Sequence, residues 1–569
     1  MTITTVTLKA YAKKRRTIDN ERYPKQTQFK PKTLTAYAIR DTQYAIRHPT
    51  YEPNRPAPPR VSGLELDTNA HCRIIVPSMN RRDFLKCVGA GAALGVPAGC
   101  MKTGTQTTAP KPKWFDRLTT LSRVEGKPNV LFVFTDDQRE DTIGALGNPH
   151  IKTPNLDKLA RSGLTFTNAY CMGGNAGAVC RPSRNMLLSG RAYFRFGTNG
   201  ADGNQKLYAG PDMPNFPDSM NQAGYETYHH GKQGNTERLL HPRFEHTKYV
   251  VHHNTFDTVQ PGKIICDDAI TFLKTRSKAK PFFMYLAFSE PHDPRNPAPE
   301  FLAQYQREDI PLPQNYLPFH PFDNGELKIR DEQLEAWPRT KDAIRRHIHE
   351  YYGMITGLDH HIGRLIQTMK DLGEYDNTII IFSSDQGIAI GSHGLMGKQN
   401  LYEHSMGVPL FLTGPGIPKG KTSDALVYLL DVFPTVCELV GEQVPPGLDG
   451  KSLAPVIHGR TDEVRDTIFL AYRNFQRAVR RGRWKLLRYP LINKTQLFDL
   501  QNDPYETKDL ANDPANAEKV KELMALMAEQ QKLFGDTDPL TSDNPGPPEI
   551  DLDFFKKNPP PKKKTKKQP

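Results

Sequence analysis

The stretch NVLFVFTDDQ, residues 129–138, constrains the fold of this chain more than any other. Its residues from Val130 to Phe134 form a continuous apolar run, which is followed by Asp136 and Asp137. An uninterrupted apolar run of this length is typical of a strand that is buried on both faces of a parallel sheet. Two carboxylates that follow such a strand cannot both stay buried as unpaired charges, so we expect them to face a cation.

Similar strand patterns recur along the chain. Further candidates are Tyr225–His230, Phe282–Phe288, Thr378–Ser384 and Pro409–Gly414. Helical patterns lie between them, including one at 153–163 and a long one from about Thr340 to Leu372. This alternation predicts an α/β fold, in which a large, mostly parallel sheet is sandwiched by helices.

The pattern changes from about Thr467. Short strand candidates joined by tight turns precede a helical stretch near Pro514–Phe534. We interpret this region, 466–540, as a smaller C-terminal α+β subdomain that contains an antiparallel sheet. The remaining divisions that we predict are a linker at 101–126, a main domain at 127–465 and a disordered Lys- and Pro-rich tail at 541–569.

The net charge of +13 does not indicate a nucleic-acid partner. Residues 1–78 contribute +8 and residues 556–569 contribute +7, so the body of the chain carries about −2. A nucleic-acid-binding domain would carry its basic residues as a patch on a folded face. We therefore exclude nucleic-acid binding as the main function, and adhesion of the basic tail to an anionic polymer stays a secondary alternative.

Residues 79–100, MNRRDFLKCVGAGAALGVPAGC, have the features of a twin-arginine export signal. The twin arginine is followed by an apolar run that is too short to span a membrane, and small residues precede Cys100. The segment predicts export by the twin-arginine machinery to the periplasm or cell envelope. Cys100 resembles a lipoprotein acylation site, although Pro97 stands where leucine is usual. Cleavage after Ala98, which leaves a soluble protein, is the alternative.

A signal of this kind normally lies close to the first residue of a chain. We therefore expect translation to begin at Met79, and a genuine disordered extension over 1–78 is the alternative. The cysteines that follow the signal are too few and too scattered to predict a disulfide framework. They are Cys171, Cys180, Cys266 and Cys437.

Polar side chains follow two of the predicted strands directly. Asp136 and Asp137 follow the first, and Asp385 and Gln386 follow the strand at 378–384. The carboxyl ends of strands are where open α/β sheets place their ligand sites. Three carboxylates and an amide oxygen, with no nearby His or Cys ligand, fit Ca²⁺ or Mg²⁺ rather than zinc. A strand-end aspartate often only caps the next helix, but two sets in the same topological place predict a metal site.

The stretch AVCRPSRNMLLSGR, residues 178–191, surrounds Cys180 with arginines, a proline and a serine. A structural cysteine usually has apolar neighbours, and this sequence enters a core only with difficulty. Pro182 suits the first position of a helix, whose electropositive start, strengthened by Arg184, attracts an anion. The pattern predicts that Cys180 is a reactive group or the precursor of one.

Cys180-Arg-Pro-Ser-Arg184, which ends in Leu188-Ser-Gly-Arg191, resembles the signature of the type I sulfatases of the alkaline phosphatase superfamily. The resemblance covers nearly all of residues 127–535 and implies a sulfuric ester hydrolase. It implies that a formylglycine-generating enzyme oxidises Cys180 to formylglycine, whose hydrate is the nucleophile and is held by Arg184. The implied ligands of one Ca²⁺ ion are Asp136, Asp137, Asp385 and Gln386.

The resemblance also assigns residues that act on the substrate. Lys232, in HGKQGN, and Lys398, in GKQNLYE, match sulfate-binding lysines, and His292, in EPHDPRNP, matches the histidine that faces the leaving group. Taken alone, the two lysines could be surface residues. The sequence departs from the family pattern at Gly234, where a histidine is usual. His393 or His230 are the candidates to replace that contact.

Two smaller departures are Gln386, where Asn or His is more usual, and Ser189 in place of threonine. Export and the family imply a sulfated carbohydrate as substrate, with an aryl or choline sulfate as the alternative. Two other functions stay open. One is a phosphate or phosphonate ester hydrolase of the same superfamily. The other is an inactive carbohydrate-binding lipoprotein, which Gly234 supports slightly and the intact Cys180 motif opposes.

Overall fold

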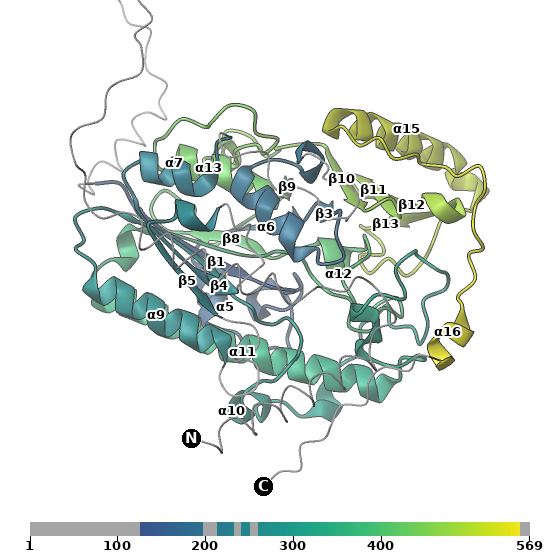
Figure 1. Cartoon of the computed structure of the whole chain (residues 1–569), viewed down its shortest axis with the longest axis horizontal. Coiled ribbons are helices and arrows are strands. Elements are labelled where there is room, and N and C mark those ends of the chain that lie inside the picture. Colours follow the sequence, from purple (N-terminus) through teal and green to yellow (C-terminus); the bar gives the residue numbers. More distant parts are fainter. Residues whose placement is uncertain (1–125, 197–212, 233–239, 251–259, 558–569) are drawn as a thin grey trace, which may run out of the picture. The chain divides into compact units, whose positions relative to one another are not determined.

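The computed structural model of the chain describes residues 126–196, 213–232, 240–250 and 260–557 (Figure 1). The predicted upstream extension, the export signal with Cys100, and Gly234 lie outside these residues. Within the described ranges, no helix combines the length and apolar character that a membrane span needs.

β1 (Asn129–Thr135) lies inside an eight-stranded sheet of order β5-β4-β6-β1-β7-β8-β2-β9. It pairs in parallel with β6 (Phe282–Ala287) and β7 (Thr378–Ser384), and all seven of its residues are buried. The other strands are β2 (Leu164–Tyr170), β4 (Glu226–Lys232), β5 (His246–Val250), β8 (Leu410–Thr413) and β9 (Lys421–Tyr428). β8 runs antiparallel to both of its neighbours, and the remaining pairings are parallel, so the predicted mostly parallel sheet is confirmed.

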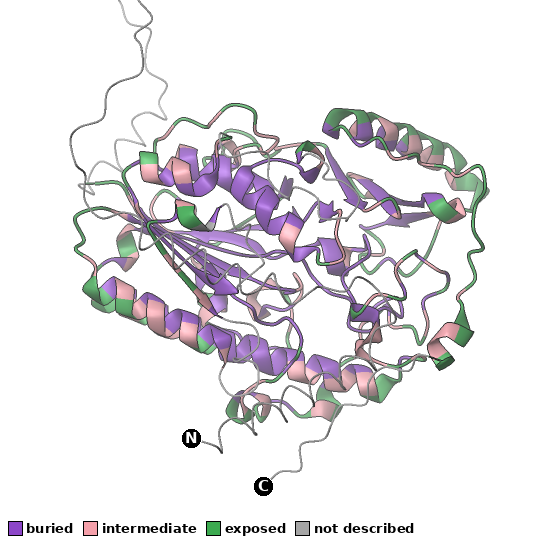
Figure 2. Cartoon of the chain, viewed as in Figure 1, coloured by how far each residue is buried: buried purple, intermediate pink, exposed green. Residues whose placement is uncertain are grey.

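Helices cover both faces of this sheet (Figures 1 and 2). α5 (Pro154–Arg161), α9 (Pro261–Thr275) and α11 (Lys341–Asp371) share one core cluster with Leu131 and Val133 of β1. α6 (Cys180–Ser189), α7 (Phe216–Gln222) and α13 (Val432–Leu439) share the other with Val130 and Phe132. Alternate side chains of a strand point to opposite faces, so the unbroken apolar run of β1 supplies both cores.

A second, five-stranded sheet has the order β13-β12-β11-β10-β3. Its antiparallel part consists of β10 (Thr467–Tyr472), β11 (Gln476–Arg481), β12 (Trp484–Tyr489) and β13 (Lys494–Asp499), and α15 (Ala517–Phe534) packs on it. β3 (Gly173–Gly174) was not predicted, and it pairs in parallel with β10. A Cβ on Gly173 would lie 2.1 Å from the Ala471 carbonyl oxygen, so only glycine permits this approach. The pairing attaches the segment before Cys180 to the C-terminal subdomain.

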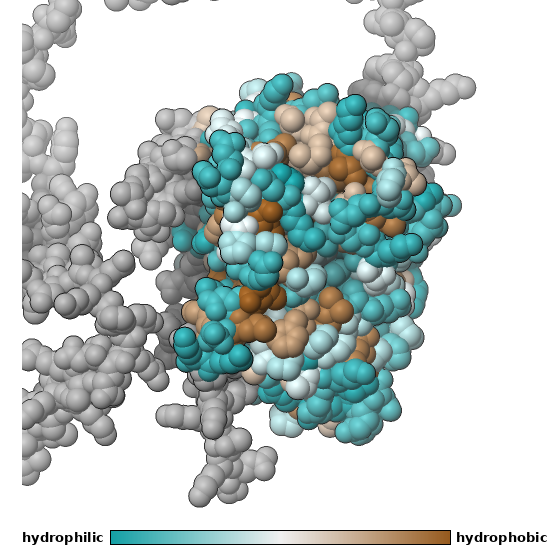
Figure 3. Space-filling model, turned by 90° about the vertical axis from the view of Figure 1, so that its right-hand side faces the viewer, coloured by the Kyte–Doolittle hydropathy of each residue, from teal (hydrophilic) through white to brown (hydrophobic). Residues whose placement is uncertain are grey.

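The prediction that disorder begins at residue 541 is wrong for residues 541–557. The backbone N–H of Asp323 donates to the Pro548 carbonyl at 2.8 Å, and the segment ends in α16 (Leu552–Lys557). The Phe555 ring lies 5.3 Å from that of Trp337. Aromatic side chains in an otherwise polar tail therefore give it a folded partner. Figure 3 shows the side of the molecule that carries α15 and α16, where hydrophilic residues dominate and apolar ones lie in separate patches.

Candidate active site

The carboxyl ends of β1 and β7 bring the four predicted metal ligands together. The two strands are neighbours with Thr135 opposite Ser384, so Asp136, Asp137, Asp385 and Gln386 leave the sheet at the same edge. Each of the four is at most 1 % exposed. The N–H of Asp137 donates to Asp385 Oδ1 at 3.1 Å, which joins the two chain segments directly.

The backbone of Asp137 adopts the left-handed conformation, with φ at 65°. This conformation costs a non-glycine residue about 1 kcal/mol or more and persists only where the surroundings enforce it. Tyr351 of α11 donates its hydroxyl to the Asp137 carbonyl at 2.6 Å, and Gln386 Nε2 donates to Asp137 Oδ1 at 2.6 Å. The strained turn directs the Asp137 carboxylate into the acidic cluster.

Cys180 is the first residue of α6, and Pro182 is the third rather than the first as predicted. The Cys180 side chain is buried, and its sulfur lies within 4.8 Å of carboxylate oxygens of Asp136 and Asp385. Burial, together with the charge of Asp136, raises the pKa of the thiol to about 12. The expectation that this segment avoids the core is wrong, because Ser183 and Arg184 are buried as well.

Arg184 is accommodated in the core because it is paired. Its Nε donates to Asp385 Oδ2 at 2.9 Å, and its Nη2 lies 3.4 Å from Asp136 Oδ2. A buried charge is tolerated when a partner and hydrogen bonds compensate for lost hydration. The arginine therefore fixes α6, and Cys180 at its start, against the acidic ends of β1 and β7.

Lys232 and Lys398 are buried beside the same aspartates and are not surface residues. Lys232, at the end of β4, donates to Asp136 Oδ2 at 3.2 Å. Lys398 Nζ donates to both carboxylate oxygens of Asp137, at 2.8 and 3.0 Å. Burial would lower the pKa of Lys398, but the charge of Asp137 outweighs it and holds that pKa well above its usual value.

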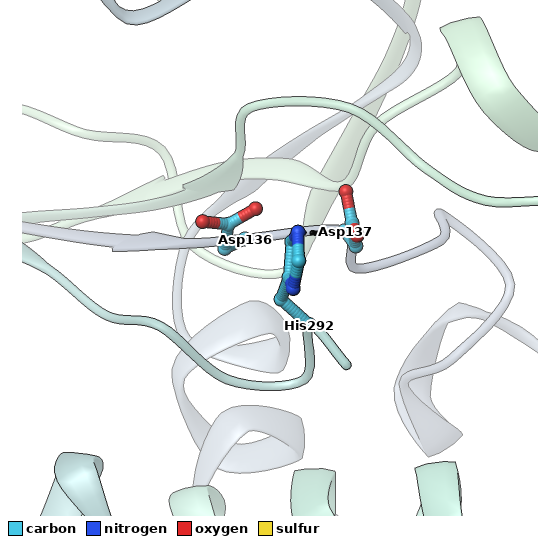
Figure 4. Close-up of side chains that lie close together, drawn as sticks. All are labelled: Asp136, Asp137 and His292. Atoms are coloured by element: carbon cyan, nitrogen blue, oxygen red, sulfur yellow. Dashed lines mark ion pairs between the residues drawn. The ribbon is translucent and has the colours of Figure 1, made fainter. Parts of the chain in front are cut away.

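His292 lies in the loop after β6, between the two aspartates that follow β1 (Figure 4). Its Nε2 is 3.7 Å from Asp137 Oδ2, and its Nδ1 is 2.6 Å from the Asp293 carbonyl oxygen. A carbonyl oxygen can only accept, so Nδ1 carries the proton in that hydrogen bond. The contact fixes the ring with Nε2 directed at the acidic cluster.

The structure does not bring His393 or His230 into this group. His393 stacks on Tyr402, and its Nε2 lies 2.9 Å from the Glu506 carbonyl oxygen of the C-terminal subdomain. His230 Nε2 lies 3.0 Å from Asp268 Oδ2 on α9. Nε2 of each histidine is therefore directed elsewhere, which does not support the assignment of His393 to substrate binding.

The donor set fits a hard cation. Asp136, Asp137 and His292 offer ligand atoms within 4.8 Å of one another, as do Asp136, Cys180 and Asp385, so the expectation that no His or Cys lies near the carboxylates is wrong. Burial, together with repulsion from the charge of Asp136, raises the pKa of Asp385 to about 7. A bound cation would relieve this repulsion. Gln386 Oε1 has no hydrogen-bond partner among the described residues. Carboxylate and amide oxygens are the ligands that Ca²⁺ prefers.

Several side chains around the cluster were not predicted from the sequence. Tyr351 was hidden in the apolar pattern of α11, although its hydroxyl accepts from Arg139 N and donates to Asp137 O. Asp293 is adjacent to His292 and could have been noticed from that position alone. Its partner Arg330 lies on a segment between β6 and α11 without periodic pattern, and only the fold reveals the contact.

Comparison with known proteins agrees with this fold and site. The family model Sulfatase matches residues 128–442, and the model for the C-terminal part of N-sulphoglucosamine sulphohydrolase matches residues 391–533. The chain therefore belongs to the sulfatase family, the type I enzymes of the alkaline phosphatase superfamily, and is a sulfuric ester hydrolase.

Among curated relatives, an N-acetylglucosamine-6-O-sulfatase of Bacteroides thetaiotaomicron is 28% identical over 500 residues, which are 73% of this chain and 88% of the relative. An arylsulfatase of Clostridium perfringens is 27% identical and covers 71% of this chain and 94% of the relative. A structure solved with its substrate D-glucosamine-2-N,6-O-disulfate is 25% identical, with a TM-score of 0.61, over 73% of this chain and 99% of that one.

Proposed function

We propose that this sulfatase hydrolyses sulfate monoesters of carbohydrates, with the oxidised form of Cys180 as nucleophile and one bound Ca²⁺ ion. The observation that carries the proposal is the position of Cys180. It lies at the start of α6, within 4.8 Å of the carboxylates of Asp136 and Asp385. The same two aspartates form ion pairs with the buried side chains of Arg184 and Lys232.

Formylglycine and Ca²⁺ would each supply one element of the chemistry. The hydrate of a formylglycine at position 180 would supply the nucleophile and the means to release sulfate afterwards. Ca²⁺ would be held by Asp136, Asp137, Asp385 and Gln386, and its charge would neutralise sulfuryl oxygens. The chain supplies the rest, because Lys232 and Lys398 place fixed positive charge where the sulfuryl group must bind.

The charge balance of the site favours an anionic substrate. The three aspartates are matched by Arg184, Lys232 and Lys398 in buried ion pairs, so these six side chains balance in charge when all are ionised. A bound divalent cation adds two positive charges, and a sulfate monoester brings one negative charge. The site with its cation would therefore carry a net positive charge that attracts the sulfate ester.

We assign to His292, in its doubly protonated form, the donation of a proton from Nε2 to the leaving oxygen. The hydrogen bond from Nδ1 to the Asp293 carbonyl orients the ring, and Nε2 faces the site. A sugar alkoxide is a poor leaving group, for which proton donation typically contributes about 10²–10⁴-fold. A nitrophenolate leaves without a proton and needs the histidine far less.

The carbohydrate substrate is supported by the relatives. The Bacteroides thetaiotaomicron protein is named for N-acetylglucosamine 6-O-sulfate, and the similar solved structure contains a sulfated glucosamine. We also propose that the chain is exported by the twin-arginine route to the periplasm or cell envelope, with Cys100 as a lipid anchor or Gly99 as a free terminus.

A panel of sulfated oligosaccharides, with a nitrophenyl sulfate, choline sulfate and matched phosphate and phosphonate esters, tests the proposal. We expect sulfate release from one or more of the oligosaccharides at a kcat/KM well above that for the matched phosphorus esters. Cys180→Ala, purified in parallel, should release none. Preferential turnover of a phosphate or phosphonate ester would contradict the proposal.

A further inference from the structure

Arg330 contacts Asp293, the residue that follows the proposed proton donor His292. Its Nη1 and Nη2 donate to the two carboxylate oxygens of Asp293, at 2.7 and 2.9 Å. Asp293 directly follows His292, and its carbonyl oxygen is the one that Nδ1 of His292 approaches to 2.6 Å. The forked geometry fixes the Asp293 side chain in two directions at once.

Arg330 is also connected to the loop that carries Lys398. Its Nε donates to Asp331 Oδ1 at 2.9 Å, and Asp331 Oδ2 accepts from Gln399 Nε2 at 2.7 Å. The Gln399 side chain accepts in turn from the backbone N–H of Lys398 at 3.0 Å.

The same glutamine reaches the segment before Cys180. Gln399 Nε2 donates to the Gly177 carbonyl at 2.8 Å, three residues ahead of Cys180. A single polar network, which we call the Arg330 clamp (Asp293, Arg330, Asp331 and Gln399), therefore joins the loops that carry the histidine, the lysine and the cysteine.

The contribution of the Arg330 clamp to the stability of these loops depends on how deeply its side chains are buried. Asp293 and Asp331 are only 5 % and 6 % exposed, whereas the Arg330 side chain is 59 % exposed. An exposed ion pair usually contributes little, but here the arginine compensates two carboxylates that water reaches poorly. Loss of Arg330 would leave the Asp293 carboxylate with too little compensation, and we expect the loop that carries His292 to move toward water.

We propose that Arg330 is a positioning residue for His292: through Asp293 it holds the imidazole at the distance and angle that transfer of a proton to the leaving oxygen requires. This inference rests on the proposed function of His292. A displacement of about 1 Å in a positioned group can cost about 10²-fold in rate, so an arginine outside the reacting atoms can have a large effect.

A double-mutant cycle on two substrates tests the inference. Arg330→Ala, His292→Ala and the double variant are assayed on a sugar sulfate and on nitrophenyl sulfate. We expect Arg330→Ala to lower kcat for the sugar sulfate about 10-fold or more, with KM changed less than about twofold, and to affect nitrophenyl sulfate far less. In the His292→Ala background, the second substitution should cause almost no further loss.

Three further variants keep the test decisive. Asp293→Asn removes the charge pair with little change of shape, and it replaces Arg330→Ala if that variant does not fold. Arg330→Lys keeps the charge but loses the fork and should restore part of the rate. Arg364→Ala removes an exposed ion pair between α11 and α9, 2.6 Å from Asp267, and should leave both rates unchanged.

The outcomes separate the inference from the function on which it rests. Equal losses on both substrates, losses that add in the double variant, or a change in KM alone would overturn the positioning role of Arg330. If His292→Ala itself slows both substrates equally, the proposed proton donor is wrong, and the inference falls with it.

Discussion

Arg184 Nε lies 2.9 Å from Asp385 Oδ2, and neither side chain has any solvent exposure. The pair ties the helix that begins at Cys180 to the strand that ends at Asp385. It therefore links the proposed nucleophile position to the proposed cation ligands without any intervening loop.

Arg184→Ala should strongly destabilise the fold. The substitution leaves the buried carboxylates of Asp385 and Asp136 without their shared partner, and removal of one member of a buried pair typically costs about 3–5 kcal/mol. Chemical denaturation of the unmodified chain measures the free energy of unfolding. The exposed pair lost in Arg364→Ala is the control, with a cost below about 1 kcal/mol. A similar small loss in Arg184→Ala would contradict the structural role of the pair.

Asp136→Asn should weaken Ca²⁺ binding and activity together, because it removes one anionic ligand from the cation. The rise in melting temperature on addition of Ca²⁺ gives a readout that does not depend on turnover, since a ligand that binds only the folded state stabilises it. The wild-type chain should show this rise and the variant should not. Full activity after exhaustive chelation would count against a metal-dependent site.

The native N-terminus should be Cys100 or Gly99. This follows if translation begins at Met79 and the twin-arginine signal is removed on export. Mass spectrometry of the protein purified from its own cell envelope locates the first residue and shows whether Cys100 carries a lipid. Peptides from residues 1–78 in that material would refute both the expected start and the cleavage.

The central strands could be predicted because they are covered on both faces. β1, β6 and β7 are continuous apolar runs, and their place inside the sheet requires that composition. Strands β2, β5 and β9 were missed. All three contain polar and partly exposed residues, and β5 and β9 lie at the edges of the sheet. The direction of β8 is not encoded in its apolar run, so its antiparallel pairing was not foreseeable.

The residues of the site also divide into those that could be predicted from the sequence and those that could not. Asp136 and Asp385 follow predicted strands directly, so their meeting at one edge followed from the topology. Lys232, His292 and Lys398 were assigned by resemblance, and the fold places all three around the acidic cluster. Contacts made by irregular segments could not be foreseen. The burial of Arg184 was unexpected because the sequence does not show which acids will neutralise it.

Peptide mass spectrometry across residues 178–191 of active enzyme tests the central claim most directly. If Cys180 is the precursor of the nucleophile, its peptide should be about 18 Da lighter than the unmodified sequence, as the change from thiol to aldehyde requires. The lighter fraction should rise in proportion to activity when the formylglycine-generating enzyme is co-expressed, and Cys180→Ala should be folded but inactive. Fully active enzyme that carries only the unmodified thiol would contradict the account.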